Sequence, residues 1–467
     1  MGVNDFDLGL VAAALERALA HGGEFAEVYV EERDGLTLRL EDRRLEQTSG
    51  GRDFGAAVRL LDGERTFYAY SDEVDEAGLT AAADAVAAAL RGSHGVGAPV
   101  VHLGSAQSRP GAHPVVVPPE TVDVRRKADL LRAADDEARA AGGEIAQVIA
   151  AYADARQRVL IANSLGEVVR DDRTRTRVSV QCVARRGEVI QTGHETLGGS
   201  CGFELLGQPA VLGVAREAAG KALVMLDSKP APVGLMPVVL ANGFGGTLFH
   251  EACGHGLEAD AVAKDASIYA GRLGEAVAAP IVDAYDDGAV INGWGSAAYD
   301  DEGVATRRTQ VIAGGRLTGY LYDRLRARQA GAQPTGNGRR QSFRHVPIPR
   351  MTTTYIAPGD DTPEAIIAAT PRGFYAKSLA GGQVEPASGN FVFGVAEGYL
   401  IEDGRITTPL RGATLVGNGI DILLKIDMIA SDYEVKSGIC GKDGQGVPVG
   451  TGQATLRIAE MTVGGTG

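Results

Sequence analysis

Hydrophobic and polar residues alternate with two different periods in the first half of the chain. A helical period of apolar residues at 8–19 predicts an amphipathic helix that Asn4 or Asp5 would cap, and the same period predicts helices at 79–90 and 122–141. Strand-like runs of alternating or apolar residues lie at 27–30, 36–40, 56–61, 66–69 and 178–182. The first half is therefore predicted to mix helices with strands.

The second half carries mainly strand and turn signals. A proline-marked turn at 229–232 leads into an apolar strand at 237–241, and a helix should follow it directly. Two pairs of apolar arms around glycine turns, at 311–317 and 399–406, predict hairpins. We expect an α+β fold: an N-terminal mixed α/β region followed by a β-rich, mainly antiparallel C-terminal domain that carries this helix.

The turn at 229–232 is also the best place for a domain boundary. It gives an N-terminal α/β domain over 1–228 and a C-terminal β-rich domain over 229–467. Residues 92–120 are rich in proline and glycine and keep no period, which predicts an extended linker inside the first domain. A chain of 467 residues is long enough to bury a sizeable core in each part.

Charge and cysteine usage exclude several classes of function. The formal net charge is −14, from 46 basic and 60 acidic residues, and no run of Lys and Arg predicts a nucleic-acid partner. The N-terminus lacks a basic secretory start, and the longest apolar run, at 81–90, is too short to span a bilayer. Four scattered cysteines (Cys182, Cys201, Cys253, Cys440) make no disulfide framework, so each is expected to be a buried side chain or a metal ligand. We expect a soluble, cytoplasmic protein with no membrane partner.

The stretch FHEACGHG, at 249–256, differs by one residue from the zinc motif H-E-x-x-H. In that motif two histidines four residues apart share one helix face. Here the histidines are His250 and His255, which are five apart and differ by roughly 140° on a regular helix. A regular helix would therefore turn the two side chains away from each other.

Three arrangements could still form a metal site. A π-bulge, eased by the glycines beside the second histidine, would bring His250 and His255 together. Alternatively, Glu251 could bind with His255, or His250 with Cys253. The bulge is favoured because it leaves Glu251 free to act as a base. Two histidines satisfied by backbone carbonyls at a helix end remain the alternative without a metal.

A third ligand must come from elsewhere, because catalytic zinc is held by three protein side chains with a fourth position open to water. His194 lies in a glycine-rich stretch that predicts a loop, and His345 is possible from its place in the second half. Cys182 belongs to an alternating strand and fits a core position. Cys440 lies between glycines, and Lys442 two residues later would favour its thiolate. These residues alone leave open whether Cys440 is a ligand or a buried side chain.

The whole chain resembles the TldD/PmbA metalloproteases, and specifically their TldD-type, metal-bearing branch. Five stretches in order carry the resemblance: FHEACGHGLEAD (249–260), DDEG (300–303), PTGNGRR (334–340), PRMTTTY (349–355) and SGICGKDGQ (437–445). Thr353 departs from the family pattern, which usually has asparagine there. That departure puts in question whether substrate contacts near this segment are the usual ones.

The resemblance implies both a site and an activity. His250, His255 and Cys440 are the implied zinc ligands, and Glu251 is the implied catalytic base. The implied function is a zinc metallopeptidase that hydrolyses small or unfolded peptides, with peptide or natural-product maturation as a further expectation. Some relatives look to cleave an amide in a small-molecule biosynthetic intermediate instead. The implied partner is a PmbA/TldE-like chain in a heterodimer, or a second copy in a homodimer.

Two other functions stay open at this point. A structural or regulatory zinc module would need a fourth protein ligand, for which Cys253 and His345 are the candidates. Nucleophilic catalysis by a cysteine would use Cys440 with a histidine, and Lys442 would lower the pKa of its thiol.

Overall fold

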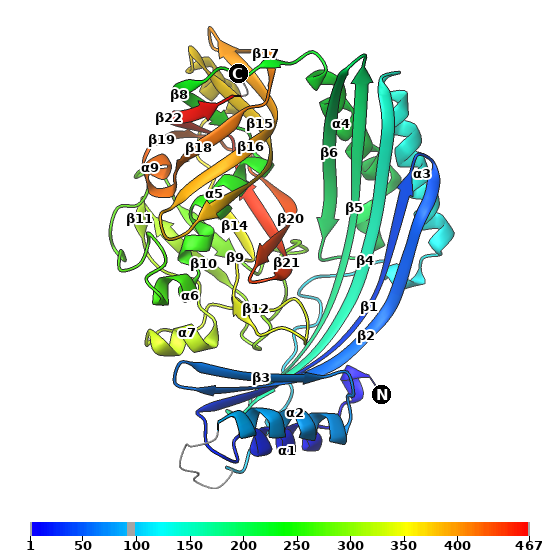
Figure 1. Cartoon of the computed structure of the whole chain (residues 1–467), viewed down its shortest axis with the longest axis vertical. Coiled ribbons are helices and arrows are strands. Elements are labelled where there is room, and N and C mark those ends of the chain that lie inside the picture. Colours follow the sequence, from blue (N-terminus) through cyan, green and yellow to red (C-terminus); the bar gives the residue numbers. More distant parts are fainter. Residues whose placement is uncertain (1, 91–98, 466–467) are drawn as a thin grey trace.

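In the computed structural model, which describes residues 2–90 and 99–465, a long curved sheet stands beside a second, β-rich region (Figure 1). The curved sheet has the strand order β3-β2-β1-β4-β5-β6, and each neighbouring pair is antiparallel. The predicted strands at 27–30 and 36–40 are parts of one continuous strand. The strands are β1 (Phe25–Glu41), β2 (Arg44–Asp62), β3 (Arg65–Ser71), β4 (Ile145–Asn163), β5 (Val168–Arg186) and β6 (Val189–Gly199).

Four helices cover the outer side of this curve (Figure 1). They are α1 (Leu8–Ala18) and α2 (Glu76–Ala89) at one end, and α3 (Val124–Ala140) and α4 (Gln208–Met225) at the other. The three predicted helices are confirmed, but the predicted cap is wrong, because Asp7 accepts the hydrogen bond from the Gly9 amide. Helix α4 escaped prediction because mainly small alanines pack it against the sheet, and they produce a weak apolar stripe.

The inner face of the curved sheet contacts the second half of the chain. Side chains alternate along a strand, so Tyr29 points inward while its neighbours face the helices. Tyr29 packs with Tyr299 and Phe343. The buried carboxylate of Glu27 also pairs with Arg340. Contacts between residues far apart in sequence thus hold the two regions together.

Two further sheets build the second half. One has the order β11-β10-β9-β14-β21-β20, and the other β15-β8-β22-β18-β16-β17-β7, with β19 added to β22. The first contains β9 (Ala284–Asp287), β10 (Arg308–Ala313), β11 (Arg316–Leu317), β14 (Thr353–Ile356), β20 (Glu434–Lys442) and β21 (Gln445–Gln453). The second contains β7 (Lys229–Pro230), β8 (Gly234–Leu240), β15 (Arg372–Glu385), β16 (Asn390–Glu402), β17 (Arg405–Arg411), β18 (Thr414–Asn418), β19 (Ile426–Ile429) and β22 (Leu456–Gly464).

Most of these strands pair antiparallel, as predicted. Among the ladders that the structure describes, the parallel ones are β14–β21, β8–β15 and β7–β17. The hairpins at 311–317 and 399–406 are confirmed as β10–β11 and β16–β17. A short ladder joins β12 (Gly338–Arg339) to β13 (Ile348–Pro349). The α+β fold class is therefore confirmed.

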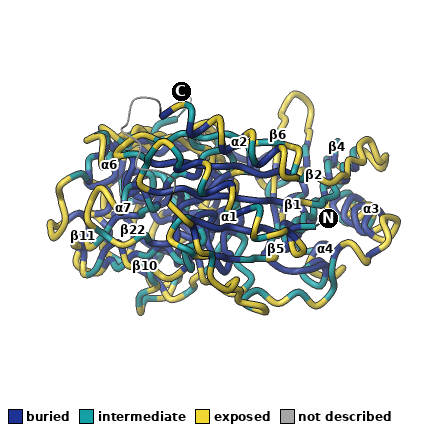
Figure 2. The backbone as a smooth tube through the Cα atoms, turned by 90° about the horizontal axis from the view of Figure 1, so that it is seen from below, coloured by how far each residue is buried: buried dark blue, intermediate teal, exposed yellow. Residues whose placement is uncertain are grey.

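Short helices fill the space around the two sheets. Helix α5 (Gly246–Ala252) contacts β14 and β21 of one sheet and β15 and β16 of the other, so it is buried between them. The remaining helices are α6 (Ala259–Ala263), α7 (Arg324–Gln329), α8 (Pro363–Ala368) and α9 (Gly419–Leu424). Buried residues gather in the interior and exposed residues at the periphery (Figure 2). No helix in the described ranges has the length and hydropathy needed to cross a membrane.

The proposed domain boundary falls between the last strand of the curved sheet and β7. The strands of the curved sheet end at residue 199, and those of the other sheets begin at residue 229. The division at 228/229 falls at the end of this gap and stays a prediction. Of the proposed linker, residues 92–98 lie outside the described residues. Residues 99–118 hold neither helix nor strand beyond an isolated bridge between Gln107 and Val169, and the turn η2 (Pro119–Thr121) follows.

Candidate metal centre

The helix that holds His250 stops before it reaches His255. Helix α5 ends at Ala252, and Cys253 departs from helical torsion angles, with φ −126° and ψ −52°. The 3-10 turn η5 (Gly254–Leu257) follows at once. The predicted π-bulge is therefore wrong, because the chain changes helix type instead of inserting a residue. The change of helix type still brings the two histidines together, as expected, since the imidazole centroids of His250 and His255 lie 5.2 Å apart.

The glycines beside His255 serve close packing. Neither Gly254 nor Gly256 has a positive φ. A Cβ atom on Gly254 would lie 2.1 Å from the sulfur of Met351, and one on Gly256 would lie 2.6 Å from the ring of Tyr269. Any side chain at either position would push the turn out of place. The pattern G-H-G thus fits the turn between two neighbouring segments.

The structure brings together the three residues that were expected to bind a metal. The ligand atoms of His250, His255 and Cys440 all lie within 4.8 Å of one another. The sulfur of Cys440, on β20, lies 3.3 Å from Nε2 of His255. Nitrogen and sulfur ligands of a tetrahedral zinc ion are about 3.3–3.6 Å apart. The donor types, and the spacing of Cys440 and His255, therefore fit zinc.

Neighbouring side chains fix the orientation of both imidazoles. Nδ1 of His255 lies 2.9 Å from Oε2 of Glu258, and Nδ1 of His250 lies 3.1 Å from the hydroxyl of Thr354. Because Nδ1 of each ring is occupied, Nε2 remains for a metal. The sequence reading missed both partners. Glu258, three residues after His255, could have been found from its helical spacing, but Thr354 lies on a distant strand and gave no signal.

Electrostatics favour the thiolate of Cys440. Burial alone would raise the pKa of this thiol, but the hydrogen bonds and charges of His250 and His255 outweigh burial and lower the pKa to about 4. Lys442 was expected to lower the pKa of this thiol, but the two histidines do so instead. The ammonium group of Lys442 instead lies 3.0 Å from Glu258.

A series of ion pairs of alternating charge links the cluster to the residues packed beside it. Burial would raise the pKa of Glu258, but His255 and Lys442 lower it to about 2, so this carboxylate stays charged. Burial would lower the pKa of His255, yet Glu258 and Cys440 raise it well above its usual range. Lys442 is held in turn by Asp260 at 2.7 Å. In this network each buried charge has a partner of opposite sign.

Glu251 lies at the open side of the cluster. One of its carboxylate oxygens is 3.7 Å from Nε2 of His255, and the side chains of His255 and Glu251 are 12% and 20% exposed. Burial raises the pKa of Glu251, which makes its carboxylate more basic. Glu251 is therefore placed beside the three donor atoms, where a solvent molecule can reach it.

The alternative ligands do not join the cluster. Cys253 is fully buried beside Tyr269, and burial raises the pKa of its thiol to about 12. His345 contacts the hydroxyl of Ser342 at 2.9 Å. Within the described residues, neither Cys253 nor His345 belongs to the group of potential ligands around Cys440.

The remaining candidates lie away from this site. His194 is not in a loop as predicted but lies in β6, where it pairs with Gln181 of β5. Cys182 is a core residue, as expected from its strand pattern. Thr353, the departure from the family pattern, is fully buried and packs against Gly450, so its side chain is not available to a peptide at the surface.

Known proteins match the chain over most of its length. Family models described as PmbA/TldA metallopeptidase domain 1, central domain and C-terminal domain match residues 26–90, 117–226 and 233–465. A Haemophilus influenzae protein named metalloprotease TldD homolog is 39% identical, over 95% of this chain and 93% of its own. A Saccharolobus solfataricus protein named zinc metalloprotease TldD homolog is 33% identical, over 63% of this chain and 66% of its own.

The fold is also known from a solved structure. The crystal structure of TldE from Thermococcus kodakarensis matches with a TM-score of 0.76, over 98% of this chain and 100% of that chain, at 19% sequence identity. This likeness shows the fold alone. The family models and the relative in Haemophilus influenzae show more, because they cover most of the sequence and include the stretch with both histidines. The chain belongs to the PmbA/TldD family of metallopeptidases.

Proposed function

We propose that this chain is a zinc metallopeptidase, a TldD-like subunit that hydrolyses peptide bonds in small or unfolded peptides. One observation carries the proposal: two imidazoles and a thiol converge, with the carboxylate of Glu251 beside them. Within the described residues, no fourth protein ligand joins this group. A catalytic zinc site leaves its fourth position open to water, whereas a structural zinc site fills it with a fourth protein ligand. The names of the relatives support the same activity.

The residues divide the chemistry between them. Zinc bound to His250, His255 and Cys440 would polarise the peptide carbonyl and lower the pKa of the attacking water. Glu251 would accept the proton of that water and return it to the leaving amine. Glu258 and Thr354 would hold the imidazoles in place through Nδ1.

The recessed position of the cluster supports an unfolded substrate. Cys440 is 5% exposed, and its two neighbours in the cluster are mostly buried. A flexible chain can reach such a site more easily than a rigid surface can. We expect an unfolded protein to be cleaved faster than its folded form, and equal digestion of both forms would contradict this preference. Maturation of a peptide or natural product, or cleavage of a small-molecule amide, are narrower versions of the same proposal.

Replacing Glu251 with Gln tests the assignment of the base. The variant should bind zinc as the wild type does but lose about 10²–10⁴-fold in kcat, because proton transfer is lost while the ligands are unchanged. Metal analysis and digestion of an unstructured peptide measure the two properties on the same sample. Wild-type turnover at full zinc occupancy would show that Glu251 is not the base.

The assay should be run with this chain alone and with a PmbA/TldE-like partner. We propose a heterodimer with such a chain, or a homodimer, and the structural likeness to TldE supports a partner of the same fold. Activity that appears only after the partner is added would support the heterodimer. Full activity of the chain by itself would support the homodimer or a monomer.

One geometric feature also favours a second candidate, a cysteine peptidase. The thiol of Cys440 lies 3.3 Å from His255 and has a pKa lowered to about 4, as a nucleophilic cysteine would. The two mechanisms differ in their response to metal removal. Activity that is lost with a chelator and restored by zinc identifies the metallopeptidase, whereas chelator-resistant activity that an alkylating agent abolishes identifies the cysteine nucleophile.

A further inference from the structure

A separate cavity of about 210 Å³ lies behind the hairpin that carries Cys440. Ile439 and Pro448, which pair across β20 and β21, both line this cavity. The next pair, Cys440 and Val447, is buried on the opposite face of the hairpin, toward the metal cluster. The cavity and the cluster are therefore two sites on opposite faces of one hairpin.

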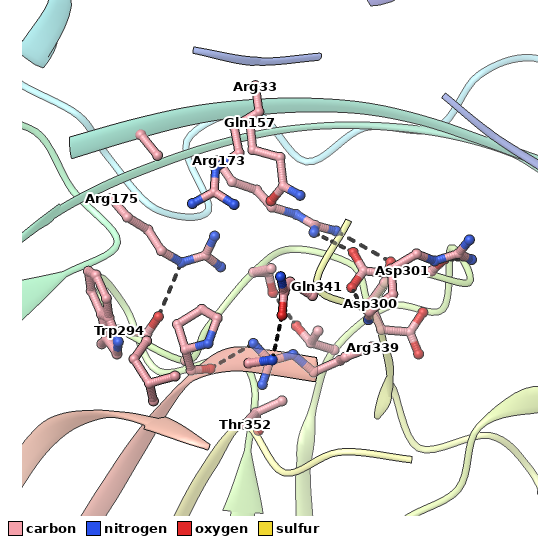
Figure 3. Close-up of a pocket in the computed structure, with 18 of the residues that line it drawn as sticks. Arg33, Gln157, Arg173, Arg175, Trp294, Asp300, Asp301, Arg339, Gln341 and Thr352 are labelled. Carbon is pink, nitrogen blue, oxygen red and sulfur yellow. Dashed lines mark hydrogen bonds and ion pairs between the residues drawn. The ribbon is translucent and has the colours of Figure 1, made fainter. Parts of the chain in front are cut away.

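Arginines from both halves of the chain converge on this cavity (Figure 3). Arg33 comes from β1, Arg173 and Arg175 from β5, and Arg339 from β12 on the facing side. The side chains of Gln157, Gln341 and Trp294 add polar groups and an aromatic ring to the lining. The cavity thus brings cations together across the boundary between the two regions.

Within the described part of the chain, three of these arginines have no carboxylate within ion-pair distance. Arg173 pairs with Asp171 and Asp301. In contrast, Arg175 donates to the backbone carbonyls of Trp294 and Ser296, at 3.2 Å each. Among the described residues, no carboxylate forms an ion pair with Arg33, Arg175 or Arg339.

Arg339 is held in the same way as Arg175. Its two terminal nitrogens donate to the carbonyls of Met351 and Pro448, and the residue is 7% exposed. A buried cation normally has an anionic partner, because hydrogen bonds to neutral groups do not offset the loss of water. Burial lowers the pKa of Arg339 to about 10, although the charges of Asp301 and Asp286 raise it, so these distant carboxylates only partly compensate this cation.

The carboxylates that line the cavity are bound by other groups and do not pair with Arg33, Arg175 or Arg339. Asp154 is bound by Lys127 at 2.6 Å, and Asp301 by Arg173. The oxygens of Asp300 accept hydrogen bonds from three backbone amides. Burial and the charge of neighbouring arginines lower the pKa of Arg175. A guanidinium stays protonated in a protein, so the local field of the cavity is positive.

We propose that this cavity binds a small oxyanion, a phosphate or carboxylate group, through Arg33, Arg175 and Arg339. The planar guanidinium groups match the geometry of such an anion with paired hydrogen bonds. The volume holds an oxyanion with several waters, since one water needs about 10–15 Å³. Four of the five stretches that carry the family resemblance contribute to this lining, through residues 300 and 301, residues 336, 339 and 340, residue 352 and residue 439. None of these cavity residues belongs to the group of potential metal ligands.

Binding can be measured on the whole zinc-loaded chain by thermal unfolding and calorimetry. Inorganic phosphate, succinate and chloride are compared at constant ionic strength, so that screening is equal in all samples. We expect phosphate or succinate to raise Tm and to bind with a measurable Kd, while chloride does neither. The stronger of the two ligands identifies the source of the oxyanion.

Two substitutions locate the binding site. Arg33→Gln and Arg175→Gln should each weaken binding at least about tenfold, because each removes a charged hydrogen-bond donor. Arg33 is exposed and forms no ion pair within the described residues, so this variant is expected to fold normally. The matched control is Arg44→Gln, an exposed arginine outside the cavity, which should bind as the wild type does. Wild-type affinity in both cavity variants, or no effect of either oxyanion beyond chloride, would overturn the proposal.

Discussion

The two faces of the β20–β21 hairpin treat buried charge in opposite ways. On the metal face, the thiol of Cys440 meets His255, and Glu258 lies between His255 and Lys442. On the cavity face, Arg175 and Arg339 meet backbone carbonyls. One strand pair therefore separates a network in which each buried charge has a partner of opposite sign from a group of arginines that donate to neutral carbonyls.

The difference indicates what each face is built to receive. The donor atoms on the metal face can be satisfied by protons, and a zinc ion would replace those protons at the same positions. The cavity face has no such substitute, because an arginine cannot give up its charge. Under the two proposals, a cation would complete the first face and an anion the second. Four substitutions test this contrast, and they are taken in order of the effect that we expect.

Replacing Cys440 with Ser should have the largest effect. It removes the anionic ligand, and we expect almost all tightly bound zinc to be lost, together with peptidase activity. The control is Cys253→Ala, a buried cysteine next to the histidines that faces Tyr269 and should keep its zinc. Metal content after gel filtration measures both variants. Phosphate binding should survive in Cys440→Ser, and its loss would show that the two faces are not independent.

Replacing Asp301 with Asn should cost about 3 kcal/mol of unfolding free energy, because it leaves Arg173 with one buried partner instead of two. Burial would raise the pKa of Asp301, but Arg173 outweighs burial and lowers it. The stabilisation is therefore complete above the unfolded pKa of about 4 and is lost progressively as the pH falls from there through the lowered pKa of the folded state. Denaturant titration at neutral and acidic pH should show a deficit that shrinks in acid.

The control for this substitution is Asp427→Asn. Asp427 pairs with Arg457 at the surface, at 2.9 Å and with 39% of the carboxylate side chain exposed. Such a pair contributes about 1 kcal/mol or less. An equal loss in the two variants would mean that burial does not strengthen the contact of Asp301 with Arg173.

Periodicity was enough to predict much of the fold. The helices at 8–19, 79–90 and 122–141 have bulky apolar residues on one face, and the two predicted hairpins have glycine turns. Helix α4 was missed because alanines make a weak stripe. The length of β1 was also missed, because β1 pairs along its length with β2 and with β4, which is more than one hundred residues away. The inward orientation of Tyr29 was missed because the residues it packs against lie in the second half of the chain.

The site was predictable where its chemistry is local or carried by a motif. His250, Glu251 and His255 were found from one short stretch, and Cys440 was assigned through the family resemblance. The route by which the histidines meet was predicted wrongly, since α5 ends at Ala252 and a 3-10 turn, in which Gly254 packs against Met351, carries His255. The arginine cavity was not predicted, although four of the stretches that carry the family resemblance line it, because Arg33, Arg175 and Arg339 lie far apart in sequence and no local pattern indicates that they meet.

Replacing Glu258 with Gln should lower zinc affinity by about 10–100-fold, because the carboxylate that orients His255 loses its charge. Competition with a chromophoric chelator gives the affinity. Asp260→Asn is the matched control, since Asp260 also pairs with Lys442 but, among the described residues, forms no hydrogen bond or ion pair with His255. A loss in the control as large as in Glu258→Gln would assign the effect to Lys442 and not to the imidazole.

Replacing Arg175 with Gln should have the smallest effect and the opposite sign. In a chloride buffer we expect Tm to rise by about 1–2 °C, because removing one unpaired charge relieves repulsion in the cavity at the expense of two hydrogen bonds to carbonyls. The matched control is Arg173→Gln, two residues earlier on β5, which should lower Tm because it leaves Asp171 and Asp301 unpaired. Added phosphate should reverse the order of wild type and Arg175→Gln, since only the wild type gains a ligand. A fall in Tm for both variants would mean that Arg175 is already satisfied by its carbonyls, and the contrast between the two faces of the hairpin would then be lost.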